Sequence, residues 1–104
     1  MEETEFNQLV DDTLLTIEEA IEASEADLDW DLTGGILTIE CANGTQVIIN
    51  RQTPTRQIWV AARRGGFHFD YNANDENWYQ GEQELYALLN LALSEQCDEP
   101  VTLR

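Results

Sequence analysis

The sequence predicts an α+β fold: a two-layer α-β sandwich, with an antiparallel sheet of five to six strands and N- and C-terminal helices packed on one face. Three observations predict it. Apolar residues recur at steps of three and four near both ends of the chain, which is the spacing of amphipathic helices. Between these ends apolar and polar residues alternate, as in half-buried strands. Tight-turn sequences join the alternating runs, so consecutive strands are antiparallel neighbours.

The first helix is expected over about residues 4–23, with Thr4 as its N-cap. Its apolar stripe consists of Phe6, Leu9, Val10, Leu14, Ile17 and Ile21. From Asp27 the period changes to two, which predicts a strand. In that strand the inward side chains are Leu28, Trp30 and Leu32, and the outward ones are Asp27, Asp29 and Asp31.

The remaining elements follow from turn signals. Gly34-Gly35 leads into the strand "ILTIECA", and Asn43-Gly44 between two alternating runs predicts a type I′ hairpin turn. Further strands are expected in "TQVIINRQ", "RQIWVAAR", "FHFDY" and "NWYQ". A second helix is expected over about residues 82–96. Its apolar stripe consists of Leu85, Leu88, Leu89 and Ala92.

Composition limits the class of protein. A chain of 104 residues fits a single domain, residues 1–104, and its net charge of −16 repels nucleic acid and anionic membranes. No run approaches the ~20 apolar residues of a membrane span, and the N-terminus lacks the pattern of an export signal. Cys41 and Cys97 are too few for a disulfide scaffold and lack metal-motif spacing, which fits a reducing compartment. We expect a soluble cytoplasmic protein.

The stretch from Thr16 to Gly35 holds seven carboxylates and no basic residue. Acidic neighbours on adjacent helical turns destabilise a helix by ~0.2–0.5 kcal/mol per pair, and acids in its last turn oppose the macrodipole. An ordinary solvated face would mix in Lys or Arg. We therefore expect one continuous acidic ridge that binds cations or a basic protein surface. Its members are Glu18, Glu19, Glu22, Glu25, Asp27, Asp29 and Asp31.

Carboxylate oxygens suit hard cations such as divalent and trivalent metal ions. The run Asp27-x-Asp29-x-Asp31 begins like a calcium-binding EF-hand loop, but that motif needs Gly at Leu32 and Glu at Thr38. The carboxylates therefore predict weak cation binding at several sites, each open on one side, with water completing the coordination.

Catalytic signals are nearly absent. His68 is the single histidine and has the character of an ordinary surface residue, and no phosphate-binding loop occurs. We expect no enzyme activity, although weak ferroxidase activity stays open.

The uncovered face of the sheet carries a second signal. Period two places Asn50 and Gln52 on one side of their strand, and Gln57 and Trp59 on one side of the next. An exposed Trp among amides is typical of an interface anchor. The alternative is that a loop or the C-terminal tail covers Trp59, and the spacing alone does not decide between the two.

The segments "NRQTPTRQIWVA" and "GGFHFD" resemble the signature of the frataxin family, and of its bacterial members in particular. "LTIEEAIE" and "GGILTIECANGTQVIINRQ" fit the same family, so the resemblance covers nearly the whole chain. Eukaryotic relatives carry an Arg where this chain has His68, so the role of that position is open.

The resemblance implies an α-β sandwich that binds iron weakly through the acidic ridge and regulates or assists iron–sulfur cluster assembly. It implies docking on the cysteine desulfurase and scaffold complex through Asn50, Gln52, Gln57 and Trp59. We expect a monomer, with iron-driven oligomerisation left open. Two alternatives remain, a ferroxidase or iron-storage role and an acidic adaptor that needs no metal. Di-iron ferroxidases use Glu-x-x-His pairs inside a helical bundle, and this chain has none.

Overall fold

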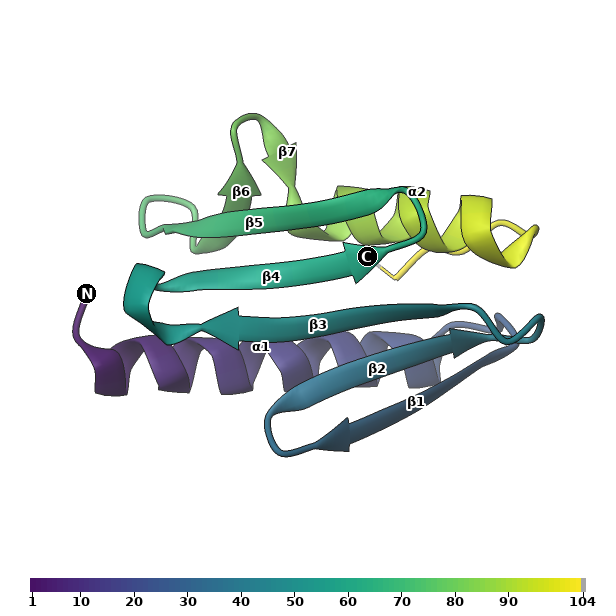
Figure 1. Cartoon of the computed structure of the whole chain (residues 1–104), viewed down its shortest axis with the longest axis horizontal. Coiled ribbons are helices and arrows are strands. Elements are labelled where there is room, and N and C mark those ends of the chain that lie inside the picture. Colours follow the sequence, from purple (N-terminus) through teal and green to yellow (C-terminus); the bar gives the residue numbers. More distant parts are fainter. Residues whose placement is uncertain (104) are drawn as a thin grey trace.

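The computed structural model describes residues 1–103 and shows two helices against a single sheet (Figure 1). A short 3-10 turn, η1, separates β3 from β4. The elements of this part of the chain are α1 Glu3–Ala23, β1 Leu28–Thr33, β2 Ile36–Cys41, β3 Gln46–Gln52, η1 Thr53–Thr55, β4 Gln57–Ala62, β5 Gly65–Asn72, β6 Asn77–Gln80, β7 Gln83–Glu84 and α2 Leu85–Cys97.

The sheet is an antiparallel meander in which spatial order follows chain order from β1 to β7. Both helices lie behind it in Figure 1, which leaves the other face uncovered. The predicted two-layer α+β sandwich is therefore confirmed. The sheet has seven strands where five to six were expected, because β7 contains only Gln83 and Glu84. Two residues are too few to show an alternating pattern.

The helix boundaries differ from the prediction at their starts. The N-cap of α1 is Glu2, without a side-chain capping bond, so Thr4 lies inside the helix and is not its cap. Helix α2 begins at Leu85, three residues later than expected. There the Glu84 carboxylate accepts hydrogen bonds from the amides of Tyr86 and Ala87, at 2.9 and 3.0 Å. These two bonds satisfy amides that have no partner within the helix, which fixes its start.

The type I′ geometry occurs at a different hairpin from the one predicted. That turn needs a positive φ at both central residues, and Gly34 and Gly35 have φ of 61° and 76°. At the other hairpin Gly44 has φ of 87°, whereas Asn43 is not among the residues with positive φ. The Gly44 amide donates to the Cys41 carbonyl at 2.9 Å. Cys41 to Gly44 therefore form a four-residue turn in which Gly44 is the last residue and not a central one. The type I′ prediction for Asn43-Gly44 was wrong.

The core lies between the sheet and the helices. The buried face of α1 is the predicted stripe without Leu9, and α2 contributes the predicted Leu85, Leu88, Leu89 and Ala92. Trp30 was expected to be buried but is 36% exposed. It points to the helix side, like its cross-strand partner Ile39, but β1 is an edge strand with a neighbour on one side only. No helix among residues 1–103 combines the length and apolarity needed to cross a membrane.

The C-terminal segment after α2 also packs into the core. Val101 and Leu103 are buried. The Val101 amide donates to the Ser94 hydroxyl at 2.8 Å, and the Leu103 amide donates to the Asn90 side-chain oxygen at 2.7 Å. The segment therefore runs back along α2 and fills the helical layer.

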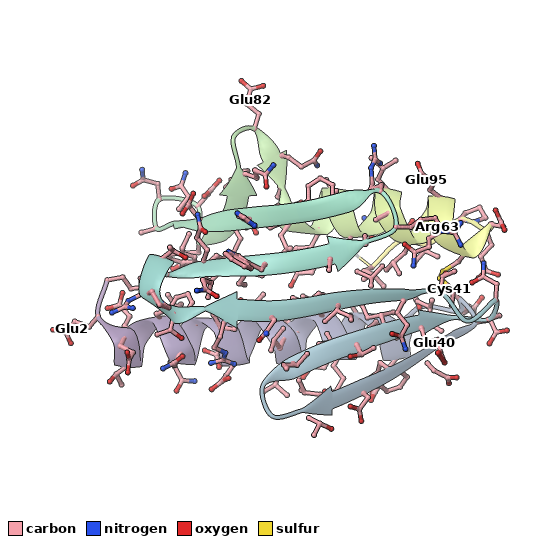
Figure 2. All side chains as sticks on the ribbon, in the orientation of Figure 1. Glu2, Glu40, Cys41, Arg63, Glu82 and Glu95 are labelled. Carbon is pink, nitrogen blue, oxygen red and sulfur yellow. A yellow bond between two sulfur atoms is a disulfide. The ribbon has the colours of Figure 1, made fainter. Side chains whose placement is uncertain are left out.

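The structure corrects the interpretation of the two cysteines. Cys41 and Cys97 form a disulfide, with their Cα atoms 5.2 Å apart. Figure 2 shows Cys41 at the end of the sheet where β2 turns toward β3. The two residues are 56 positions apart, so their contact depends on the tertiary fold and leaves no sign in local spacing. A bond of this kind does not support the expectation of a permanently reducing environment.

Candidate functional site

The helical part of the acidic ridge lies at the C-terminal end of α1. Glu19 and Glu22 are exposed and Glu18 is half-buried, because Ile17 and Ile21 turn the opposite side of the helix toward the sheet. Glu25 and Asp27 follow in the connection to β1, and both are exposed. These carboxylates therefore lie along the C-terminal end of α1 and the connection that follows it.

The strand part of the ridge faces another direction. In β1, Leu28 is buried against the helices, so period two turns Asp29 and Asp31 to the opposite, uncovered face of the sheet. The ridge is therefore not a single flat stripe. It passes from the helical layer around the edge strand to the outer face of the sheet, and Glu25 and Asp27 lie at the bend.

The seven ridge carboxylates make no hydrogen bond or salt bridge with any described residue. Asp11, on the same helix, differs: its carboxylate accepts from the Arg51 guanidinium at 2.6 Å. Arg51 also donates to the Asn7 side chain at 3.0 Å. Arg51 thus neutralises Asp11 in the first half of α1, whereas no described basic residue pairs with the ridge at its C-terminal end.

The ridge does not enclose a metal ion. Across residues 1–103, no three carboxylate, histidine or cysteine side chains converge into a coordination group. The donors are oxygen atoms on side chains that are exposed or, for Glu18, half-buried, which fits hard cations held from one side with water completing the shell. The chemistry of the donor set therefore fits iron or similar ions, and the geometry fits weak binding.

Two carboxylates that the sequence analysis did not single out adjoin the ridge. Glu40 is the cross-strand partner of Asp29 and shares its face, where directly opposed residues have Cβ atoms about 4.5–5.5 Å apart. Glu99 accepts a hydrogen bond from the Asp27 amide at 3.3 Å. The Gly34-Gly35 turn fixes the register that pairs Glu40 with Asp29, so that neighbour could have been predicted. The approach of Glu99 depends on the path of the C-terminal segment.

The four residues predicted for partner binding form two neighbouring cross-strand pairs on the uncovered face of the sheet. Asn50 of β3 pairs with Trp59 of β4, and Gln52 pairs with Gln57. We call these four residues the sheet-face patch. The Trp59 indole N–H donates to the Gln57 side-chain oxygen at 3.1 Å, so the patch is held together by its own hydrogen bonding.

Trp59 is exposed, with 38% of its surface accessible. The C-terminal segment that could have covered it packs along α2 instead. On β5, His68 is the cross-strand partner of Trp59, and the two rings stack with centroids 4.2 Å apart and planes at 11°. Beside them lies a shallow hollow of about 270 Å³, whose lining includes Ile48, Ala61 and Gly66. His68 is thus a surface residue, as expected, and it also supports the exposed indole.

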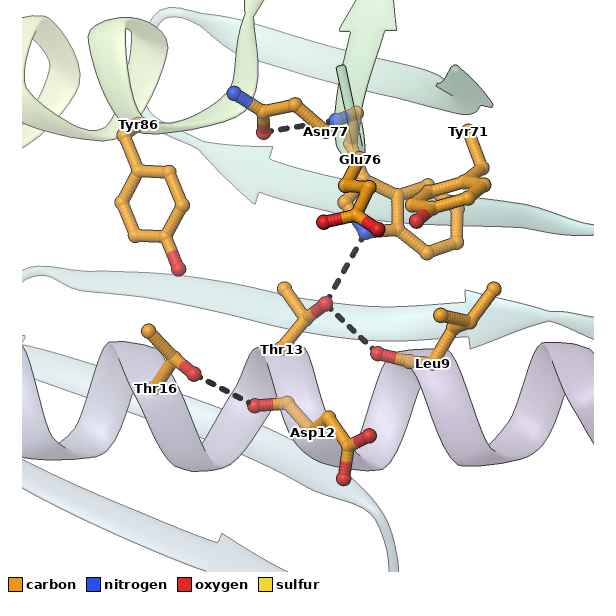
Figure 3. Close-up of a pocket in the computed structure, with 9 residues that line it drawn as sticks. Leu9, Asp12, Thr13, Thr16, Tyr71, Glu76, Asn77 and Tyr86 are labelled. Atoms are coloured by element: carbon orange, nitrogen blue, oxygen red, sulfur yellow. Dashed lines mark hydrogen bonds between the residues drawn. The ribbon is translucent and has the colours of Figure 1, made fainter. Parts of the chain in front are cut away.

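A second hollow lies between α1 and strands β5 and β6 (Figure 3). The Thr13 hydroxyl accepts from the Trp78 indole at 3.1 Å and donates to the Leu9 carbonyl at 2.7 Å. Burial raises the pKa of the Tyr71 phenol, and the nearby carboxylates of Glu76, Glu5 and Asp75 raise it further. The bond from Trp78 to Thr13 fastens the helix to the sheet, so we assign this region a structural role.

Comparison with known proteins agrees with this geometry. A family model described as a frataxin-like domain matches residues 1–99. The iron-sulfur cluster assembly protein CyaY of Pseudomonas aeruginosa is 48% identical over 103 residues, which covers 97% of this chain and 95% of that protein. The protein of the same name from Vibrio cholerae is 44% identical, with 97% of each chain covered.

A solved structure of the frataxin from Psychromonas ingrahamii has the same fold. Its TM-score is 0.89 at 40% sequence identity, and the match covers 100% of this chain and 99% of the other. The resemblance read from the sequence is therefore confirmed. The acidic ridge and the sheet-face patch belong to a chain that is a member of the frataxin family.

Proposed function

We propose that this protein binds iron through the acidic ridge and regulates or assists iron–sulfur cluster assembly by docking on the cysteine desulfurase and scaffold complex. The observation that carries the proposal is the pairing of two surfaces on one small fold. One holds seven unpartnered carboxylates, and the other presents an exposed Trp59 among amides. Relatives of the same length bear the name iron-sulfur cluster assembly protein.

Iron is cargo or signal in this proposal, not a resident cofactor. Each bound cation relieves repulsion between neighbouring carboxylates, which is the source of the affinity. Since no three side chains converge on one point, water supplies most of the coordination shell and exchange with the solvent is easy. Iron bound in this way can pass to a partner. Other divalent or trivalent ions of similar hardness should compete.

Docking would use both surfaces in different ways. The ridge creates a strong negative field that attracts a basic patch on the partner from a distance. The sheet-face patch supplies contact, because a stacked indole that is already oriented by His68 loses little freedom on binding. The proposed complex is thus guided by charge and held by the uncovered face of the sheet.

The two alternatives have weaker support. A ferroxidase would be expected to hold two iron ions close together inside the fold, whereas the ridge carboxylates are exposed and unconverged. An acidic adaptor without a metal role would explain the negative electrostatic field of the ridge. It gives no reason for the ridge to continue around the edge strand to Asp31 and to Asp29, which lies opposite Glu40. We therefore favour the non-catalytic, iron-binding role.

The test is anaerobic cluster formation in a mixture of cysteine desulfurase, scaffold protein, cysteine and Fe(II), followed by absorbance. We expect this protein to change the rate of cluster formation. The ridge variant Glu18→Gln, Glu19→Gln, Glu22→Gln and the patch variant Trp59→Ala should each lose most of that effect.

A matched control removes the same charge elsewhere. Glu2, Glu3 and Glu5 lie at the N-terminal end of α1, away from the ridge, and their triple Gln variant should behave like the natural protein. If the ridge and patch variants also change the rate as the natural protein does, the proposed function is wrong.

A further inference from the structure

The disulfide connects two segment ends that adjoin the acidic ridge. Cys41 is the last residue of β2 and Cys97 is the last residue of α2. Cys41 is the cross-strand partner of Leu28, which lies between Asp27 and Asp29. Two residues beyond Cys97, Glu99 accepts the hydrogen bond from the Asp27 amide. Cys41 thus pairs with the first residue of β1, and the chain two residues beyond Cys97 reaches Asp27, just before β1.

Hydrogen bonds of Gln96 also hold the end of α2, independently of the disulfide. The Gln96 side chain is 2% exposed. Its amide donates to the Gln46 carbonyl at 2.8 Å, and its oxygen accepts from the Arg63 amide at 2.9 Å. The Gln96 carbonyl accepts from the Asn43 side chain at 2.9 Å. These bonds tie α2 to the β2–β3 and β4–β5 turns, so we expect the fold to persist when the disulfide is broken.

The chain just beyond the disulfide has fewer attachments. Asp98 has a left-handed backbone, with φ of 57°, and is exposed. Glu99 is held at the Asp27 amide by a single bond of 3.3 Å. Residues of this segment and of the α1–β1 connection line one hollow, which includes Glu25, Ala26, Glu99 and Pro100. Firm anchoring resumes only at Val101, through Ser94.

We propose that Cys41 and Cys97 form a reversible redox site whose reduction loosens residues 98–100 and the adjoining bend of the acidic ridge, residues 24–28. The co-reactant class is a dithiol. Cys97 is half-buried whereas Cys41 is 3% exposed, so Cys97 is the accessible sulfur. This site is a property of the chain's own cysteines and does not require that the ridge bind iron.

The chemistry is thiol–disulfide exchange. A thiolate of the dithiol attacks the Cys97 sulfur and forms a mixed disulfide, and Cys41 leaves as a thiolate that takes up a proton. The second thiol of the reductant then attacks its own sulfur in the mixed disulfide and releases Cys97, which is protonated in turn. Two electrons pass to the protein, and the reductant ends as a cyclic disulfide. Reaction with an oxidised dithiol reverses the sequence.

A consequence for the ridge rests on the proposed function. In the oxidised form the Glu99 carboxylate is held beside Asp27 and shares a hollow with Glu25. A third carboxylate fixed near this bend adds to its attraction for cations, and holding it in place removes an entropy cost of binding. We therefore expect tighter Fe(II) binding in the oxidised form, by a factor of about 2 to 10 for one half-buried carboxylate.

The test compares the oxidised protein with protein reduced by dithiothreitol, with thiols counted by alkylation and mass measurement. The reduced form should stay folded, and its Tm should fall by about 5–15 °C, as for a disulfide that closes a long loop. Amide hydrogen exchange should accelerate about tenfold or more at residues 27–28 and 98–99. Exchange in β4 should be unchanged under conditions where only local opening is measured.

The variant Cys97→Ser supplies the matched control. It should resemble the reduced protein and should not respond to dithiothreitol, and it permits Fe(II) titration without a chelating thiol. Two alkylated cysteines in air-equilibrated protein, unfolding on reduction, or unchanged exchange at residues 27–28 and 98–99 would each overturn the redox site. If neither form binds Fe(II) but the exchange difference persists, the proposed function fails and the redox site stands.

Discussion

The acidic ridge and the sheet-face patch differ in their internal interactions, which are repulsive in the ridge and attractive in the patch. The ridge carboxylates have no partner among the described residues and repel one another, so their arrangement works against the local stability of α1. The patch is held by its own contacts, which are the Trp59–Gln57 hydrogen bond and the stack of Trp59 on His68. The ridge lacks counter-charges until a cation or a basic surface binds, whereas the patch already has its binding conformation in the free protein.

Because of this difference, we expect the ridge to act on the association rate and the patch to act on the dissociation rate of a complex. Charge without fixed geometry acts over a distance and is weakened by salt, whereas an oriented aromatic anchor acts only on contact. A variant of one surface therefore should not imitate a variant of the other.

The largest expected effect is on complex formation with the cysteine desulfurase. Trp59→Ala should raise the dissociation rate about 30-fold or more, which corresponds to the ~2 kcal/mol of a hot-spot residue. It should leave the salt dependence of association nearly unchanged. Neutralising Glu18, Glu19 and Glu22 with Gln should instead lower the association rate and flatten its salt dependence. Surface-binding kinetics over a range of salt concentrations measure both rates.

The control for this comparison is the triple Gln variant of Glu2, Glu3 and Glu5, which removes equal charge from the other end of α1. Binding that does not vary with salt and survives neutralisation of the ridge would contradict the guiding role of the ridge and leave the sheet-face patch as the main contact.

A smaller effect concerns stability without any partner. Glu22→Gln removes repulsion from Glu18 and an unfavourable charge at the end of α1, so Tm should rise by a few degrees, about 0.5–1 kcal/mol. Asp11→Asn removes a carboxylate paired with Arg51 at 2.6 Å and should lower stability by about 0–1 kcal/mol. Thermal unfolding in low salt checks the signs. A loss of stability in Glu22→Gln would show that the ridge is not under electrostatic strain.

The sequence predicted the fold because its signals are local. Alternation and apolar stripes specify which faces are buried, and they placed Trp59 and Asn50 on the same side of the sheet as the structure does. Turn details were less predictable. Type I′ geometry belongs to Gly34-Gly35, where both residues have positive φ, whereas Asn43 does not although Asn-Gly is a favoured type I′ pair.

The site was predicted as a set of residues but not in its full shape. Burial of Leu28 turns Asp29 and Asp31 to the outer face of the sheet, so the ridge bends where a continuous stripe was expected. Trp30 stays exposed because an edge strand lacks a second neighbour. The disulfide and the approach of Glu99 to Asp27 join residues far apart in the chain, and no periodicity reports such contacts.

The most direct test of iron binding is an anaerobic Fe(II) titration followed by nuclear magnetic resonance of backbone amides. We predict that the first changes in shift and line width appear at residues 18–31 and at Glu40. Amides of the sheet-face patch (Asn50, Gln52, Gln57 and Trp59) should respond only at higher Fe(II). The variant Glu18→Gln, Glu22→Gln should weaken the first response. Early changes centred on other parts of the chain, or a response unaltered by that variant, would contradict the assignment of iron binding to the acidic ridge.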